Sequence, residues 1–488
     1  IPSLVGSEMC IRDRSTDSPA EVLTSFGETE TQFVAEYLTS EVLSHQPAEI
    51  RKFLLQTSIL DRLCAELCDA VVELPSGSSS ILLDELDQAN LFILSLGDPG
   101  GWYRYHHLFA GMLRAMLDAQ ASPDEIAALH CRASDWYAAQ GQIEDALHHA
   151  LAAGDVGSAV QLVEANARNL LNRLERDTLE RWLAMLPKEV VWQRPRLLLV
   201  QAWLLYRQAR LGAIDAVLDA AESHLDDAEN GIPPSDQQPV WGQIYALRST
   251  TACLVHSDFL RCTASAERAL EWLPIAEHGA RSTALIYWSF AKQAIGEKEM
   301  AVRRLEQVLA DPAPRGLAPP QLYHGLCWVH YLSGDLHQML GATQRSLAYA
   351  SQLNHINAIT GAHWLSGLLH YEWNDHSTAI AHFSDVVKWK HNAQFATTST
   401  AMLGLARIFQ ARGELEKAQE MIDSLRAETL RLDNIGLLPP VDSIQADQWR
   451  KQGDVARALR WARSLNPQRL GEPFFWFELP SLTQARII

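Results

Sequence analysis

Tyr371-Glu372-Trp373-Asn374-Asp375-His376-Ser377-Thr378-Ala379 is one copy of a pattern that recurs through the C-terminal two-thirds of the chain. The pattern centres on a small turn residue, repeated at intervals of 39, 38, 40, 39 and 40 residues: Ser257, Gly296, Gly334, Asn374, Gly413 and Gly453. A fixed period of about 40 residues in a helical pattern predicts a helical-repeat solenoid. Because a solenoid presents a concave binding surface, the repeat favours binding over catalysis.

Each repeat has a mechanical explanation as a pair of antiparallel helices. The turn residue marks the tight connection, where the backbone is left-handed or crowded. A small residue five positions later lets the second helix approach the first: Cys262, Ala301, Ala379, Ala418 and Ala458. An aromatic residue before the turn fills the gap between units: Tyr331, Tyr371, Phe409 and Trp449. Paired helices are expected from Asp124 onward, with long loops at 230–239 and 312–320.

Composition restricts the function classes. The chain has 488 residues, 47% of them hydrophobic, and 41 basic against 59 acidic side chains give a net charge of −18. Such a charge repels nucleic-acid phosphates, so no direct DNA contact is expected. Seven scattered cysteines fit reduced thiols in a cytoplasmic protein, and without a run of about 18 apolar residues no membrane helix is expected. Cys64 and Cys68 lie four apart without further ligands, so we interpret them as buried hydrophobes rather than a zinc pair.

The first 120 residues have a different organisation. Helices are predicted over 31–44, from Pro47 to about Gln56, from a cap at Asp61 onward, and over 81–89. An apolar run over 91–96, a Gly-Asp-Pro-Gly-Gly turn over 97–101 and Trp102-Tyr103-Arg104-Tyr105 predict a short hairpin. A further helix is expected over 106–117. Helices with a small hairpin describe a winged-helix domain.

Two segments resemble a known family. Phe33-Val34-Ala35-Glu36-Tyr37-Leu38 with Phe53-Leu54-Leu55-Gln56-Thr57-Ser58 resembles the start of the winged-helix module in MalT-like transcription activators. Tyr103-Arg104-Tyr105-His106-His107-Leu108-Phe109 resembles the end of that module. These activators are LuxR-type regulators of the STAND class of signal-transduction ATPases. The resemblance implies a mainly α fold, with a winged helix over 15–122 and a TPR-like superhelical sensor over 123–488.

The sequence also departs from that family. It contains no Gly-rich loop ending in Gly-Lys-Ser/Thr and no basic C-terminal helix-turn-helix. Residues 1–14 resemble a translated sequencing adapter, so we exclude them and expect the natural chain to begin further upstream. The chain is therefore expected to be the middle of such a regulator. It is expected to be no enzyme and to hold no cofactor, whereas the intact regulator would bind ATP or ADP and slowly hydrolyse ATP.

The resemblance supplies a candidate nucleotide contact. A histidine at the position matching His106 contacts the phosphate of bound ADP in STAND proteins, and Arg104 lies close enough in sequence to assist. An imidazole N–H at the start of a helix is chemically suited to donate to a phosphate oxygen. The alternatives are a capping or partly buried histidine and an exposed wing arginine.

Candidate inducer contacts come from the repeats. Aromatic and histidine side chains suit sugars, peptides or partner helices, and five were selected: Trp288, His324, Trp328, Trp364 and Trp373. The alternative for each is the core between repeats. No metal ligand set and no nucleophile–base arrangement was found.

Two hypotheses about function follow. The first is the signal-sensing part of a MalT-like activator, which binds a small-molecule or protein inducer and contacts its own nucleotide-binding domain. Self-association is possible in that reading, and no membrane contact is expected. The alternative is a free-standing TPR-type adaptor. The winged helix favours the first hypothesis, because an adaptor has no need of one.

Overall fold

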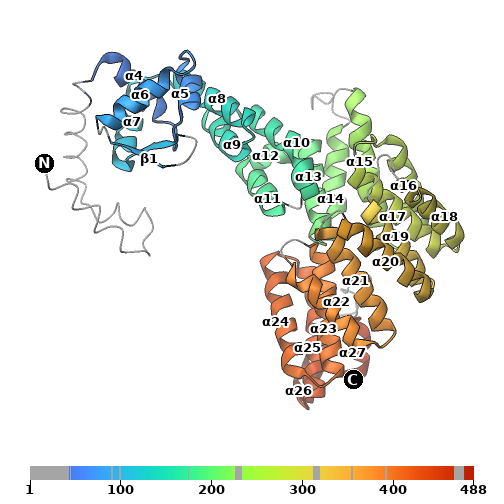
Figure 1. Cartoon of the computed structure of the whole chain (residues 1–488). Helices are drawn as coiled ribbons and strands as arrows, with labels where there is room; N and C mark the ends of the chain where they lie inside the picture. Colours follow the sequence, from blue (N-terminus) through green and yellow to red (C-terminus); the bar gives the residue numbers. More distant parts are fainter. Residues whose placement is uncertain are drawn as a thin grey trace. The chain divides into compact units, whose positions relative to one another are not determined.

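The computed structural model describes residues 43, 46–89, 92–97, 101–173, 175–225, 234–311, 319–352, 356–390, 393–465 and 478–488. The chain divides into two compact units between Ala165 and Asn166 (Figure 1). Residues 1–14 and the helix expected over 31–44, apart from Leu43, lie outside the described residues.

The first unit opens with the expected winged helix. Its elements are α4 (Ala48–Thr57), α5 (Ala65–Val72), α6 (Ser78–Gln88), β1 (Ile93–Ser95), β2 (Tyr103–Tyr105) and α7 (His107–Gln120). The strands pair antiparallel with Leu94 opposite Arg104. The hairpin is tied to the helical core by the hydroxyls of Thr57 and Tyr105, 2.7 Å apart and buried. Cys64 and Cys68 are also buried there, which confirms their interpretation as core residues.

One expected helix start was wrong. The third helix begins at Ala65 and not after Asp61, because Leu63 is drawn into the hairpin instead. Leu63 and Tyr103 exchange two backbone hydrogen bonds of 2.8 Å. Asp61 serves another purpose, since its carboxylate accepts from Arg114 of α7 at 2.7 Å.

Paired helices follow the winged helix. The unit closes with α8 (Pro123–Ala139), α9 (Ile143–Ala152) and the first part of α10 (Val156–Arg173). Two histidines lie between α8 and α9, where His130 Nδ1 and His149 Nδ1 are 2.8 Å apart.

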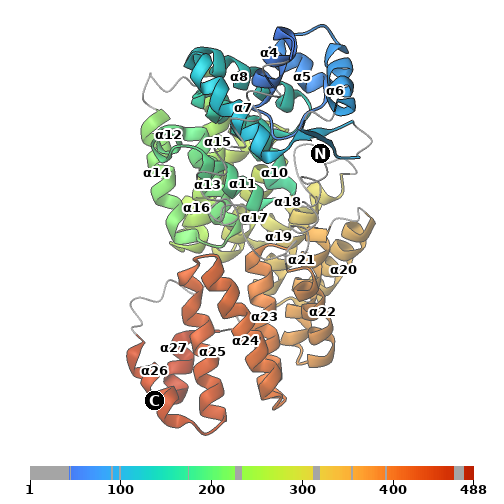
Figure 2. The same ribbon diagram turned by 90° about the vertical axis from the view of Figure 1, so that its left-hand side faces the viewer.

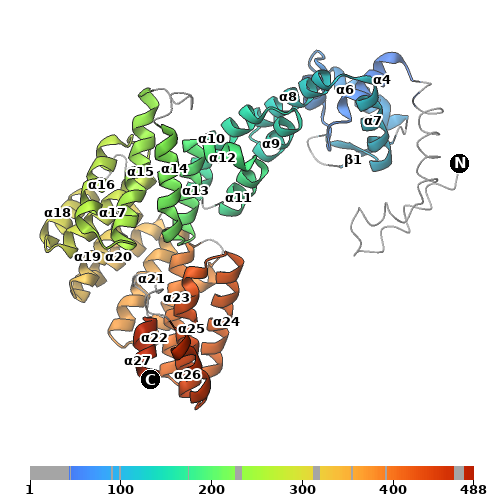
Figure 3. The ribbon, with the colours of Figure 1, turned by 180° about the vertical axis from the view of Figure 1, so that it is seen from behind.

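The second unit is a stack of helices, seen from three sides in Figures 1, 2 and 3. After α10 come α11 (Arg176–Met185), α12 (Lys188–Gln193), α13 (Pro195–Arg207), η2 (Leu211–Ala213), α14 (Ile214–Leu225), α15 (Pro234–Leu254), α16 (Phe259–Trp272), α17 (His278–Ala294), α18 (Lys298–Leu309), α19 (Pro319–Leu332) and α20 (Leu336–Gln352). The stack continues with α21 (Ile356–Glu372), α22 (His376–Lys388), α23 (Phe395–Ala411), α24 (Leu415–Arg431), η4 (Ile435–Leu437), α25 (Leu438–Lys451), α26 (Val455–Ser464) and α27 (Pro480–Ile487).

The helices form two layers. Each odd-numbered helix from α13 to α25 packs on the next odd-numbered helix as well as on its partner in the pair. We call these helices the first-helix layer. The expectation of a loop over 230–239 was wrong in part, because α15 begins at Pro234 and contains Pro239. Pro234 takes the first helical position, where the missing N–H costs nothing, whereas Pro239 lies inside the helix and removes one intrahelical hydrogen bond.

The turn residues have the predicted conformation. All six repeat marks have positive φ, from 51° at Ser257 to 88° at Gly296 and Gly453. At Gly334, its N–H donates to Tyr331 O and the Asp335 N–H to His330 O, both at 2.9 Å, so the last carbonyls of α19 are satisfied. The small residues five positions after the marks are fully buried: Cys262, Ala301, Ala379, Ala418 and Ala458. The repeat pattern therefore specified both the turns and the close helix contacts.

Candidate functional site

A late part of the helix stack, at the end of α24, contacts an early part, at the end of α13. Asn434, after α24, donates from Nδ2 to the backbone oxygen of Gln208, after α13, at 2.8 Å. Arg210 and Asp433 lie beside this bond, 3.4 Å apart. The stack therefore curves until the pair α23–α24 approaches α13, and the C-terminal end of α13 lies near the end of α24 (Figures 1 and 3).

A cavity of about 520 Å³ lies beside this contact. It is bounded by α10, α11 and α13 on one side and by the end of α22, α23 and α24 on the other. Its lining has an apolar part and a polar part: Leu170, Leu171, Leu179, Leu204, Ala393, Phe395 and Met402, with Glu175, Asp177, Thr178, Arg207, Lys390, Gln394, Thr398, Glu428 and Arg431. The volume is within the range of small-molecule sites, and the lining combines apolar walls with polar groups that could orient a ligand.

The cations of the cavity differ in their pairing. Arg431 is held by Glu428, with Nε to Oε2 at 3.0 Å and Nη2 to Oε1 at 2.6 Å. Arg207 is different, because its Nε is buried without a hydrogen-bond partner among the described residues. The buried hydroxyl of Thr398 also lacks a partner among them. The cavity thus presents unused hydrogen-bonding groups next to apolar walls.

The five aromatic and histidine candidates lie outside this lining. Trp288 is only 3% exposed and donates from Nε1 to Glu267 at 2.9 Å, so the structure places it in the core between repeats. Trp328 and Trp364 pack on each other across successive helices of the first-helix layer, with ring centroids 5.4 Å apart. Trp373 packs edge-on against His337 and His370. These contacts give the tryptophans packing roles.

His324 is also part of the packing. Its ring lies against Gly361 of the neighbouring α21, its Nε2 is buried without a partner among the described residues, and burial lowers its pKa to about 4. The histidine is therefore kept neutral at pH 7 inside the helix stack.

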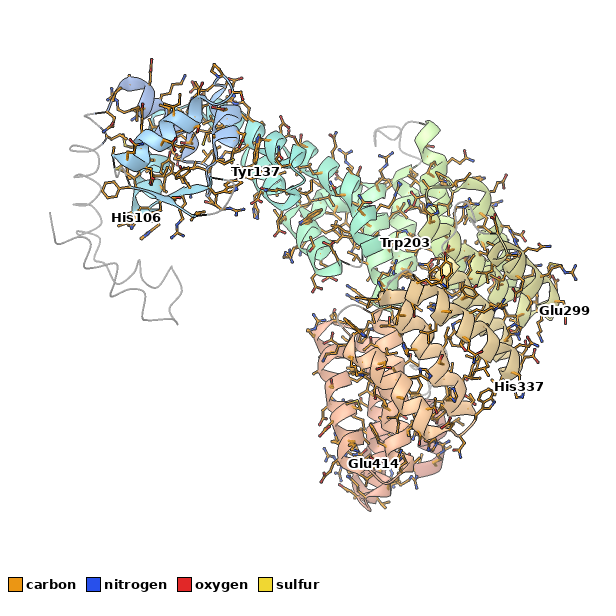
Figure 4. The ribbon with its side chains drawn as sticks, viewed as in Figure 1. His106, Tyr137, Trp203, Glu299, His337 and Glu414 are labelled. Atoms are coloured by element: carbon orange, nitrogen blue, oxygen red, sulfur yellow. The ribbon has the colours of Figure 1, made fainter. Side chains whose placement is uncertain are left out.

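The nucleotide candidates lie on the wing. His106 is the N-cap of α7, and its backbone N–H donates to Phe92 O at 2.7 Å, which fixes the junction between β2 and the helix (Figure 4). Its ring is partly buried and packs against His107, with ring centroids 4.5 Å apart. Arg104 is exposed on β2. His106 and Arg104 thus lie two residues apart on the wing, one partly buried and one exposed.

Sequence reasoning missed Arg207 and Thr398. Neither residue belongs to a motif. They line the same cavity because α23 lies opposite α13 in the folded stack. Ala209, which follows α13, has φ of 59° and so takes the turn position that glycine, asparagine or serine holds in later repeats. Absence of the usual residue at that turn hid the α13–α14 pair from the pattern.

Across the described ranges, no group of three or more His, Cys, Asp or Glu side chains is arranged to hold a metal ion. No helix in the described part of the chain is both long and apolar enough to cross a membrane.

Comparison with known proteins agrees with this architecture. Residues 39–126 match the model of the MalT winged helix domain, and residues 242–488 match that of the MalT-like TPR region. A winged helix followed by TPR-like repeats is the arrangement of a regulatory sensor region. The chain belongs to the family of MalT-like regulators.

Curated relatives of the chain are longer than the chain itself. It is 28% identical over 460 residues to the HTH-type transcriptional regulator MalT of Yersinia enterocolitica, covering 91% of this chain and 49% of that protein. It is 26% identical over 454 residues to MalT of Cronobacter sakazakii, covering 88% and 47%. The chain thus spans about half the length of the curated relatives it matches. A solved STAND protein with a tetratricopeptide repeat sensor from Pyrococcus horikoshii aligns with 88% of this chain and 64% of its own, at 13% identity and a TM-score of 0.48.

Proposed function

We propose that this chain is the sensing and regulatory part of a MalT-like, ATP-dependent transcription activator of the cytoplasm, and that an effector binds the cavity between α13 and α23–α24. The observation that carries the proposal is the position of the cavity. A ligand there touches helices that are more than 180 residues apart in sequence, as Leu204 and Met402 illustrate. It would therefore stabilise the closed arrangement of the stack over a more open one.

Such a site acts as a switch only through differential binding. A ligand shifts a conformational equilibrium by as much as its affinities for the two states differ. The cavity exists when α13 and the pair α23–α24 lie close together. An effector that contacts both walls therefore binds this closed state more tightly. The resulting change in the stack would be transmitted to the nucleotide-binding part of the intact regulator. No catalytic step by this chain is required.

The winged helix supplies the other half of the switch. In the intact protein, His106 would donate to a phosphate of ADP and hold the resting state, with Arg104 nearby. Replacing His106 by Ala would loosen ADP and raise basal activation. Unchanged ADP retention by H106A in a filter-binding assay would contradict this role.

A ligand screen tests the cavity. The full chain is screened by thermal shift against sugars, nucleotides, organic acids and short peptides, since a ligand at 100 times its dissociation constant adds about 2.7 kcal/mol. The screen is repeated with Gln394→Trp, which fills the cavity mouth, and with Gln352→Trp, an exposed position at the end of α20 as control. We expect stabilisation to be lost only in Gln394→Trp. Hits that survive in Gln394→Trp place the effector elsewhere, and hits restricted to peptides favour the adaptor alternative.

A further inference from the structure

Arg207, whose Nε is buried although the residue is only partly buried, differs from Arg248 and Arg407 of the same stack. Arg248 is 9% exposed and donates to Asp215 at 2.7 Å and to Glu222 at 3.0 and 3.1 Å. Arg407 is paired with Asp447 at 2.7 Å and with Glu478. Each of these two arginines is thus neutralised by carboxylates, which offsets the cost of burying its charge.

No such partner is found for Arg207. Its neighbours in sequence are both engaged: the Tyr206 hydroxyl lies 3.3 Å from that of Tyr287, and Gln208 donates to Glu180. Among the described residues, no carboxylate forms an ion pair with Arg207, and its Nε has no acceptor. Burial accordingly lowers the pKa of Arg207, and the neighbouring Tyr206 offsets that shift only in part.

The remaining charges of the lining leave Arg207 free to act. Glu428 is occupied by Arg431, and Glu175 and Asp177 are exposed. Lys390 adds a second exposed cation. The apolar wall beside Arg207 includes Leu204, one turn before it on α13. An anion inside the cavity would therefore lie beside the Arg207 guanidinium and next to an apolar surface.

We propose that the cavity binds a small organic anion, with its carboxylate or phosphate on the Arg207 guanidinium and its apolar body against Leu204, Phe395 and Met402. The planar guanidinium fork suits both groups, because it donates two parallel hydrogen bonds to a pair of oxygens. The Thr398 hydroxyl supplies a further donor in the lining. This inference rests on the proposed function and specifies the chemical class of its effector.

Matched probes test the class. Isothermal titration of the full chain is carried out with hexanoate, hexyl phosphate, inorganic phosphate and the neutral hexanamide and hexanol. We expect both organic anions to bind at least tenfold more tightly than hexanamide and hexanol. A preference between hexanoate and hexyl phosphate distinguishes a carboxylate from a phosphate effector. Binding of inorganic phosphate alone would overturn the role of the apolar wall.

Variants separate charge from structure. Arg207→Met should reduce affinity for the organic anions at least tenfold while raising the melting temperature of the unliganded chain, because it removes an uncompensated buried charge. Arg207→Lys keeps the charge without the fork and should bind at intermediate strength, whereas Arg210→Gln, outside the cavity lining, should bind like the parent chain. A lower melting temperature of Arg207→Met with unchanged anion affinity would make Arg207 purely structural.

The outcomes also separate this inference from the proposed function. Neutral compounds that bind equally to the parent chain and Arg207→Met but not to Gln394→Trp would overturn the anion class and leave the sensing cavity intact. Absence of any ligand sensitive to Gln394→Trp would overturn both.

Discussion

Asn434 and Gln208, 226 residues apart, are joined by a hydrogen bond of 2.8 Å from the Asn434 side chain to the Gln208 backbone oxygen. Asn434 is 5% exposed, so this bond is made away from solvent. It joins the end of α24 to the end of α13, and Arg207 and Arg431 of the proposed effector cavity are close to it in sequence. Polar contacts therefore contribute to closure of the stack at this point.

Asn434→Ala should weaken this closure. Loss of a buried hydrogen bond costs about 1–2 kcal/mol. Hydrogen exchange should accelerate at both partners, over 208–213 and 434–438, while the central helices α17–α20 keep their protection. The control Arg210→Gln removes only a neighbouring exposed ion pair, worth about 0–1 kcal/mol, and should change exchange little. Faster exchange confined to 434–438 would show that the stack closes by other contacts.

The repeat turns give a matched pair of glycines. Gly334 has φ of 72° at the α19–α20 turn, so Gly334→Ala should destabilise by about 1–2 kcal/mol, the cost of a left-handed backbone for a side chain with Cβ. Gly341 lies inside α20 with open space around its Cβ position, so Gly341→Ala should stabilise by about 0.5–1 kcal/mol. Thermal melts of both variants check the opposite signs. Equal shifts would mean that backbone conformation does not explain the repeat pattern.

These turns also show what a sequence pattern can predict. The residues at 257, 296, 334, 374, 413 and 453 all adopt the left-handed conformation that their type and spacing indicated, because turn geometry is local. The hairpin of the wing was equally predictable from the sequence, since its two strands lie close together along the chain. Helix starts were less predictable. Leu63 pairs with Tyr103, and because of this long-range contact α5 begins at Ala65 and not after Asp61.

The site was hardest to predict. Tryptophans are conspicuous in a sequence, yet Trp288 is buried and Trp328 packs on Trp364, because large aromatic rings fill the space between repeats. Arg207 belongs to no sequence motif. Its proposed role depends on the packing of α23 and α24 opposite α13 in the folded stack. Such a meeting is set by small rotations accumulated over many repeats, which no local pattern encodes.

Gly361 offers a test of packing between neighbouring repeats. A Cβ at this position would lie 2.2 Å from Cε1 and 2.3 Å from Nε2 of His324, so Gly361→Ala forces the ring to move. We expect a loss of about 1–3 kcal/mol, the usual cost of overpacking a core. His324→Ala makes room for the methyl group, so the double variant should lose less than the sum of the two single changes. A double-mutant cycle measures this coupling, and strict additivity would contradict the contact.

His324 should also make the stack sensitive to acid. Its pKa is lowered to about 4 by burial, from an ordinary value of 6.5, so the folded state resists protonation. The stabilisation is therefore complete above about pH 6.5 and is lost as pH falls toward 4, by about 3 kcal/mol at most. Hydrogen exchange in α19 and α21 should accelerate over this window in the parent chain and markedly less in His324→Gln. His278→Gln, an exposed position at the start of α17, is the control and should retain the full pH dependence. If His324→Gln kept it as well, the acid sensitivity would arise from another group.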